Sequence, residues 1–181
     1  KIAVVVLKKA GCLTPQAIFR SPHNKIAKLI YSSRFYNQKT EKLKAFCRYL
    51  LNKYSGSLDR MFSVDTDILR EELLSIKGIG RETADSIILY AGNKPSFVSD
   101  AYTKRFMDRY GLFKNLDVYE EIRSFFMANL PKDVHLYNEF HALIVHHGYK
   151  VCKAEPTCDE CPVRSISRDL YCKLGVREGS S

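Results

Sequence analysis

The sequence predicts an all-α fold made of two helical lobes. Apolar side chains recur at the spacing of one helix face along most of the chain. Short segments rich in proline, glycine and serine interrupt this pattern, as turns do. No segment alternates apolar and polar residues with the period of a half-buried strand. The 181 residues suffice for one well-buried domain or for two small lobes that share a seam.

The helical segments follow one another in a regular order. The opening apolar run is expected to be the end of an amphipathic helix. Further helical spacing is found at 26–30, 43–51, 69–74, 87–88 and 122–126. Turn residues separate these segments at 14–15, 21–22, 55–56, 92–95 and 130–131. Residues 177–181 are small and polar and are expected to fray.

The two lobes are expected to meet at the turn near residue 95. Residues 1–95 would form most of a helical-barrel lobe, and residues 96–181 a second helical lobe. The first helix begins without a capping residue or an initiator methionine. We therefore expect an N-terminal segment in the full protein that is absent from this sequence.

Charge narrows the class of partner. The chain has 29 Lys and Arg against 20 Asp and Glu, a net charge of +9. Such an excess favours a polyanion as the binding partner, and the alternative is a generic basic surface. No stretch is long and apolar enough to span a bilayer, and Lys8 and Lys9 interrupt the first apolar run. We expect an intracellular protein without a membrane partner, whose cysteines are reduced unless they bind metal.

The string LLSIKGIGRETA predicts a helical hairpin with a tight turn. Gly78 and Gly80 tolerate unusual dihedral angles and close approach of the backbone, and Ile79 between them anchors the turn in the core. The turn presents backbone N–H groups at a helix N-terminus, where an anion is favoured, and Lys77 and Arg81 add positive charge. This pattern favours a site that grips a DNA phosphate, with an ordinary αα-hairpin as the alternative.

A carboxylate follows the hairpin in the string KPSFVSDAYTKRF. Asp100 precedes a helix that begins at Ala101, which is a natural N-cap position. A plain helix cap is one interpretation. A capped carboxylate also stays ionised at neutral pH, and Lys104 one turn later would favour the charged form. Such a group can stabilise an oxocarbenium-like sugar or activate water.

Metal binding is predicted by four cysteines with the spacing C-x5-C-x2-C-x10-C: Cys152, Cys158, Cys161 and Cys172. Disulfides are not expected in an intracellular protein. Spacing alone is compatible with zinc and with a 4Fe–4S cluster. Cys12 and Cys47 fall on apolar helix faces and are expected to be core thiols.

Together, these motifs resemble the helix–hairpin–helix DNA glycosylases of the endonuclease III superfamily. A hairpin of the type L-x-G-[IV]-G is followed about twenty residues later by V-x-D, and the resemblance runs from about residue 1 to residue 172. It implies that Asp100 catalyses cleavage of an N-glycosidic bond and that Gly78, Ile79 and Gly80 grip DNA.

The cysteine segment also resembles a known loop of this superfamily. His147-Gly148 before Cys152 is similar to the start of the endonuclease III iron–sulfur loop, whose usual pattern has a longer first gap and a shorter last one. The resemblance implies a 4Fe–4S cluster, with zinc as the alternative.

Position 82 bears on the type of chemistry. Bifunctional members carry a lysine there, whose amine forms a Schiff base with the sugar and permits strand cleavage. This chain has Glu82, which we expect to complement the helix dipole. The resemblance therefore implies a monofunctional glycosylase with water as nucleophile.

The strings FYNQK and G-x-E-[ST]-A-D resemble the 3-methyladenine DNA glycosylase branch. The implied partner is double-stranded DNA with an alkylated purine, bound by a monomeric enzyme in the nucleoid-containing cytoplasm. Phe35 would wedge into the stack beside the flipped base, with a buried aromatic as the alternative. The N-terminal segment would complete the base pocket. His135, His141 and His146 are expected to be structural or on the surface.

Three alternative functions remain open from the sequence. The first is a glycosylase for thymine or uracil in mismatches, and the second is a glycosylase for oxidised pyrimidines, with or without lyase activity. The third is a DNA-binding module that has lost catalysis.

Overall fold

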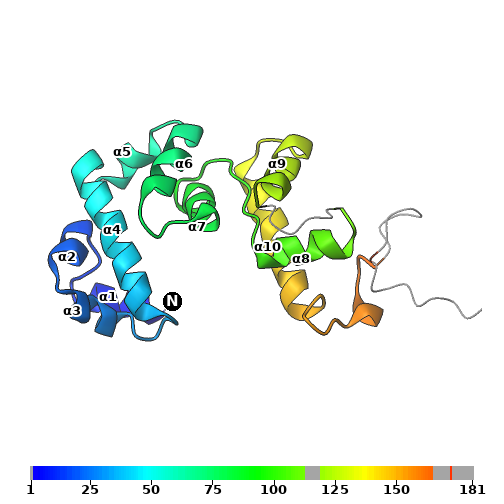
Figure 1. Cartoon of the computed structure of the whole chain (residues 1–181), viewed down its shortest axis with the longest axis horizontal. Coiled ribbons are helices and arrows are strands. Elements are labelled where there is room, and N and C mark those ends of the chain that lie inside the picture. Colours follow the sequence, from blue (N-terminus) through cyan, green and yellow to red (C-terminus); the bar gives the residue numbers. More distant parts are fainter. Residues whose placement is uncertain (1, 113–118, 165–171, 173–181) are drawn as a thin grey trace, which may run out of the picture. The chain divides into compact units, whose positions relative to one another are not determined.

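The described part of the chain is built of helices joined by short turns (Figure 1). The computed structural model describes residues 2–112, 119–164 and 172. No strand occurs among these residues, so the predicted all-α class is confirmed. The end at 177–181, expected to fray, lies outside the described residues. No helix in the described ranges has the length and apolar character that crossing a bilayer requires.

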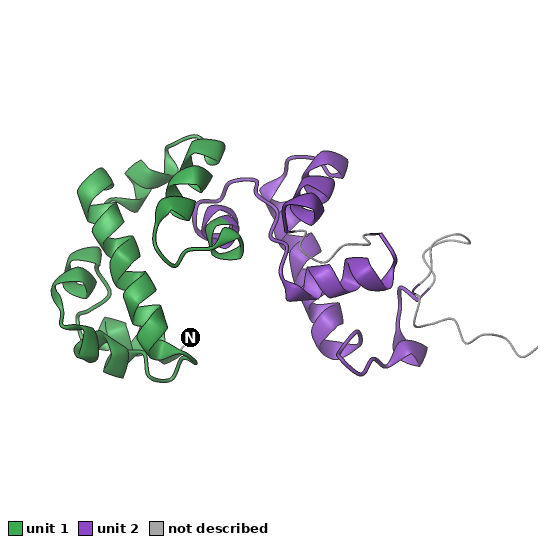
Figure 2. Ribbon diagram, viewed as in Figure 1, with its two compact units in different colours: residues 1–84 green, residues 85–181 purple. Residues whose placement is uncertain are grey.

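The chain divides into two compact units, Lys1–Ala84 and Asp85–Ser181 (Figure 2). The sequence suggested a division about ten residues later, at the turn before Ser96. The boundary lies earlier because Leu89, Phe97 and Val98 belong to the apolar core of the second unit. The turn at 92–95 therefore lies inside the second unit and does not mark the boundary.

In the first unit, the longest helix supports the shorter ones. Helix α4 packs against α2, α3 and α5, and α1 packs against α3. Leu7, Cys12, Ile26 and Ile30 form an apolar cluster there. The helices are α1 (Ile2–Lys9), α2 (Pro15–Arg20), α3 (His23–Leu29), α4 (Tyr36–Tyr54), α5 (Leu58–Phe62), α6 (Thr66–Ser75) and the start of α7 (Arg81–Ser86).

Two polar ties hold α4 to its neighbours. The Lys44 ammonium donates hydrogen bonds to the carbonyl oxygens of Ile18, Phe19 and Ser21, at 3.2, 2.7 and 2.6 Å, and so satisfies the end of α2. The Glu72 carboxylate on α6 accepts hydrogen bonds from three α4 side chains: Tyr49, Lys53 and Tyr54. The second tie places the hairpin that follows α6 beside α4.

In the second unit, α8 packs against α10 and α9. The aromatic rings of Phe97 and Phe126 stack in its core, 4.1 Å apart. A Cβ atom at Gly148 would lie 2.5 Å from Cδ1 of Tyr102, so only glycine permits the close approach of α10 to α8. The elements are η1 (Ile87–Ala91), α8 (Ala101–Arg109), α9 (Tyr119–Asn129), α10 (Val134–Lys150) and η2 (Cys158–Glu160).

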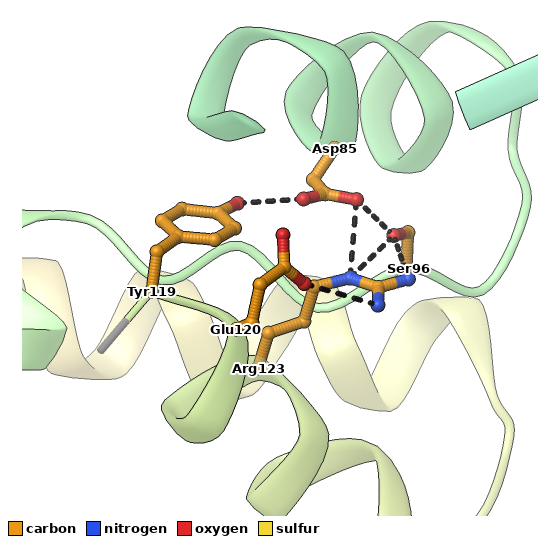
Figure 3. A network of polar contacts seen from close by, with 5 residues as sticks. All are labelled: Asp85, Ser96, Tyr119, Glu120 and Arg123. Carbon is orange, nitrogen blue, oxygen red and sulfur yellow. Dashed lines mark hydrogen bonds and ion pairs between the residues drawn. The ribbon is translucent and has the colours of Figure 1, made fainter. Parts of the chain in front are cut away.

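A buried ion pair ties α7 to α9 in this unit (Figure 3). Arg123 Nε lies 3.2 Å from Oδ1 of Asp85, whose side chain is fully buried. Ser96 donates to the same carboxylate and accepts from Arg123, and the Tyr119 hydroxyl donates to Oδ2 of Asp85 at 2.8 Å. Glu120 lies 3.9 Å from the guanidinium at the more exposed edge. The network therefore joins α7, α9 and the segment that leads to α8.

Candidate active site

Asp100 caps α8, and its carboxylate is held in place. Its Oδ1 accepts hydrogen bonds from the backbone N–H and the hydroxyl of Thr103, at 2.8 and 3.0 Å. The helix cap predicted from the sequence is thus confirmed. The side chain is 15% exposed, so the carboxylate is largely shielded yet reachable.

His141 on α10 supplies the other partner of Asp100. Its Nε2 is buried, has no regular hydrogen bond within the described residues, and lies at ion-pair distance from Oδ2 of Asp100, 3.4 Å. The Tyr90 hydroxyl bonds to Nδ1 of the same ring. If Tyr90 donates to Nδ1, the Nε2 proton faces the carboxylate.

Opposing influences set the protonation of Asp100. Burial acts most strongly and by itself would raise the pKa of the carboxyl group, but His141 and Thr103 outweigh it and hold that pKa below its ordinary value. Their contributions exceed any from Lys104, the neighbour that the sequence suggested. The site therefore presents an ionised carboxylate at neutral pH.

The sequence did not reveal that His141 lies beside Asp100 or that Tyr90 contacts His141. His141 is buried, as a structural histidine would be, but its acidic partner lies far away along the chain. Tyr90 lies on the π-helical turn η1, which directly continues α7, and π turns are frequent at functional sites. Local spacing contains no signal for either feature.

The hairpin turn has the expected backbone. Gly78 has a φ of +90°, which side chains rarely adopt, and Ile79 is buried as predicted. A Cβ atom at Gly80 would meet nothing within 4 Å, so the backbone there is open to a ligand. Lys77 and Arg81 are exposed beside the turn. Glu82 lies in the first turn of α7, where it complements the helix dipole.

Phe35 lies outside any core. It precedes α4 in the left-handed conformation, with φ 56° and ψ 39°, and is 71% exposed. The buried-aromatic interpretation is therefore wrong. A bulky exposed residue with positive φ is an outlier of the kind that gathers at functional sites.

The four spaced cysteines line one pocket in the second unit. With them lie Arg109, Tyr110 and His147. The six cysteines, all within the described residues, form no disulfide, and Cys12 and Cys47 are buried as predicted. Arg109 donates a hydrogen bond to the sulfur of Cys152 at 3.0 Å. Within the described ranges, the four side chains are not spaced as a closed metal-ligand set.

Comparison of the sequence with known protein families and proteins identifies the family of this chain. Residues 3–132 match the model of the HhH-GPD superfamily of base excision DNA repair proteins. A Methanocaldococcus jannaschii protein assigned provisionally to the DNA repair glycosylases is 44% identical over 166 residues, which cover 91% of this chain and 75% of that protein.

Two solved structures share the fold at a TM-score of 0.71. A non-covalent endonuclease III–DNA complex is 26% identical, and the match covers 93% of this chain and 81% of the other. The H. pylori 3-methyladenine DNA glycosylase bound to 1,N6-ethenoadenine is 27% identical, and the match covers 82% and 76%. The chain belongs to the HhH-GPD superfamily of base excision repair DNA glycosylases.

Proposed function

We propose that the enzyme is a monofunctional glycosylase that hydrolyses the N-glycosidic bond of an alkylated purine in duplex DNA. The observation that carries this proposal is the Asp100 carboxylate, held by Thr103 and His141 in its ionised form. The enzyme would work inside the cell as a monomer on double-stranded DNA.

Catalysis would pass through an oxocarbenium-like sugar. A purine alkylated at N3 or N7 is cationic, so it takes the electron pair of the breaking C–N bond and leaves as a neutral base. The Asp100 carboxylate stabilises the developing positive charge on the sugar and accepts a proton from the water that bonds to C1′. His141 would orient the carboxylate, and Tyr90 would hold the His141 ring in place.

The hairpin and Phe35 would hold the DNA open. Backbone N–H groups at Gly78–Gly80 bind one phosphate, beside the charges of Lys77 and Arg81. Phe35 wedges into the stack that the damaged base leaves. Its exposure and its left-handed backbone support this role, since a fixed, solvent-facing ring is ready to stack on bases.

We propose a 4Fe–4S cluster whose ligands are Cys152, Cys158, Cys161 and Cys172. Four thiols that line one pocket suit a cluster, and Arg109 beside Cys152 offsets the negative charge of thiolate ligands. The role of the cluster would be structural, because it fixes the loop after α10. Zinc is the alternative for the same donors.

The purified protein is therefore expected to be yellow-brown and to contain about four irons per chain with matching inorganic sulfide. Iron, zinc and acid-labile sulfide are measured on protein purified without oxygen. Cys152→Ser should lower the iron content, whereas Cys12→Ser should not, because Cys12 belongs to the apolar cluster of the first unit and does not line the pocket. A colourless protein with one zinc and no sulfide would contradict the cluster.

Borohydride trapping is expected to give no covalent adduct between protein and DNA. Glu82 occupies the position where a bifunctional enzyme has its amine, and glutamate cannot form an imine. Strands should break only after alkali or an abasic endonuclease. The assay uses the complete protein on an alkylated-purine duplex, with Glu82→Lys as a test for gain of trapping. An adduct lost on replacing Lys77, Lys94 or Lys104 would show that another lysine acts.

A further inference from the structure

The first unit contains a long groove that the hairpin motif does not explain. One hollow of about 640 Å³ lies between α4 and the hairpin turn and is lined by Gln38, Lys42, Arg48, Lys77 and Gly78, among others. A second hollow of about 570 Å³ continues along α4 and shares Ala45, Arg48 and Lys77 with the first. We name the two hollows together the α4–hairpin groove.

The groove gathers cations that the protein leaves uncompensated. Lys42, Arg48 and Lys77 are exposed and have no hydrogen bond or ion pair within the described residues. Two other α4 cations are engaged, since Lys44 binds the end of α2 and Lys53 pairs with Glu72. Glu41 is the one carboxylate among the described residues that line the groove. These three positive charges repel one another, and a bound anion would relieve the repulsion.

The cations adjoin the phosphate-binding turn directly. A Cβ atom at Gly78 would lie 2.8 Å from Cγ of Lys42, so the stem of this lysine packs against the turn backbone. Lys77 immediately precedes Gly78 and lines both hollows. Arg48 lies six residues further along α4 and lines both hollows. Lys77, Lys42 and Arg48 therefore form a row of positive charge that runs from the hairpin turn along α4.

We propose that the α4–hairpin groove binds the sugar–phosphate backbone of DNA beyond the phosphate held by the hairpin, with Lys42 and Arg48 as the groups that contact it. A DNA strand carries one phosphate per ~3.4 Å of helix axis, so a chain held at the hairpin brings further phosphates to adjacent cations. Gln38 and Asn52, which line the two hollows, offer neutral hydrogen bonds to the same backbone. This inference rests on the proposed function, since it extends the same DNA contact.

The test is the salt dependence of binding to an undamaged duplex. For the full chain, Lys42→Gln/Arg48→Gln should weaken binding about tenfold or more at low salt and reduce the slope of log K against log[salt] by roughly 1 to 2. The matched control is Lys8→Gln/Lys9→Gln, which also removes two charges, from exposed lysines on α1 outside the groove, and should leave the slope near wild type. Thermal unfolding confirms that each variant is folded.

The outcomes separate this proposal from the function on which it rests. A Lys42→Gln/Arg48→Gln variant that keeps the wild-type slope would overturn the groove, because the effect would be absent. A Lys8→Gln/Lys9→Gln variant whose slope falls as much would overturn it too, because the effect would then be due to net charge alone. Base excision by the wild type is measured independently. Suppose that Lys42→Gln/Arg48→Gln reduces the slope of log K against log[salt] but the wild type excises no base. DNA binding at the groove would then be supported and the enzymatic proposal contradicted.

Discussion

Replacing Asp100 with asparagine is expected to lower single-turnover base excision by on the order of 10²–10⁴-fold while DNA binding survives. Asparagine is a good N-cap and keeps an oxygen for the Thr103 N–H, so α8 and the fold should persist. What disappears is the negative charge that stabilises the sugar cation and accepts the proton of water. Binding depends instead on phosphate contacts at the hairpin and the basic surface.

The matched control for this substitution is Asp133→Asn. Asp133 caps α10 by accepting the N–H of Leu136 at 2.7 Å, so it has the same structural role away from the proposed chemistry. Because the pKa of Asp100 lies below its ordinary value, the carboxylate stays ionised and the loss should be the same from pH 6 to pH 8. Near wild-type excision by Asp100→Asn would mean that this carboxylate is only a helix cap.

The second large effect concerns stability. Asp85→Asn is expected to lower the free energy of unfolding by about 3–5 kcal/mol, because it removes the buried charge partner of Arg123 and leaves only the more exposed Glu120 carboxylate near the guanidinium. Glu120→Gln is the matched control, since it removes an exposed carboxylate 3.9 Å from the same arginine and should cost at most about 1 kcal/mol.

Urea unfolding followed by circular dichroism measures both variants. The double variant Asp85→Asn/Arg123→Gln should recover part of the loss, because no unpaired charge then stays buried. A loss for Asp85→Asn no larger than that for Glu120→Gln would show that the network in Figure 3 contributes little to the fold.

Local patterns were sufficient for several helices and for the cap at Asp100. The spacing of apolar residues predicted α3, α4, α6 and α9, and the position of Asp100 before Ala101 predicted its capping bonds. Gly78 and the buried Ile79 follow from the hairpin string for the same reason. These features depend on residues within one or two turns of each other, which is the range that sequence periodicity reports.

Partners brought together by the tertiary fold could not be read from the sequence. His141 reaches Asp100 only because α10 packs against α8, and the packing depends on Gly148 having no side chain beside Tyr102. The π turn that carries Tyr90 and the earlier boundary between the two units arise from packing in the second core. Periodicity records which face of a helix is apolar, not which residues that face meets.

The most direct test of the proposed function is release of free base by the complete wild-type protein from three matched duplexes. These carry an alkylated purine, an oxidised pyrimidine or no damage, and strand breaks are counted before and after alkali. We predict release from the alkylated duplex at the highest rate, with strands intact until alkali is added. Faster release of the oxidised pyrimidine, with strands already broken before alkali, would contradict the account.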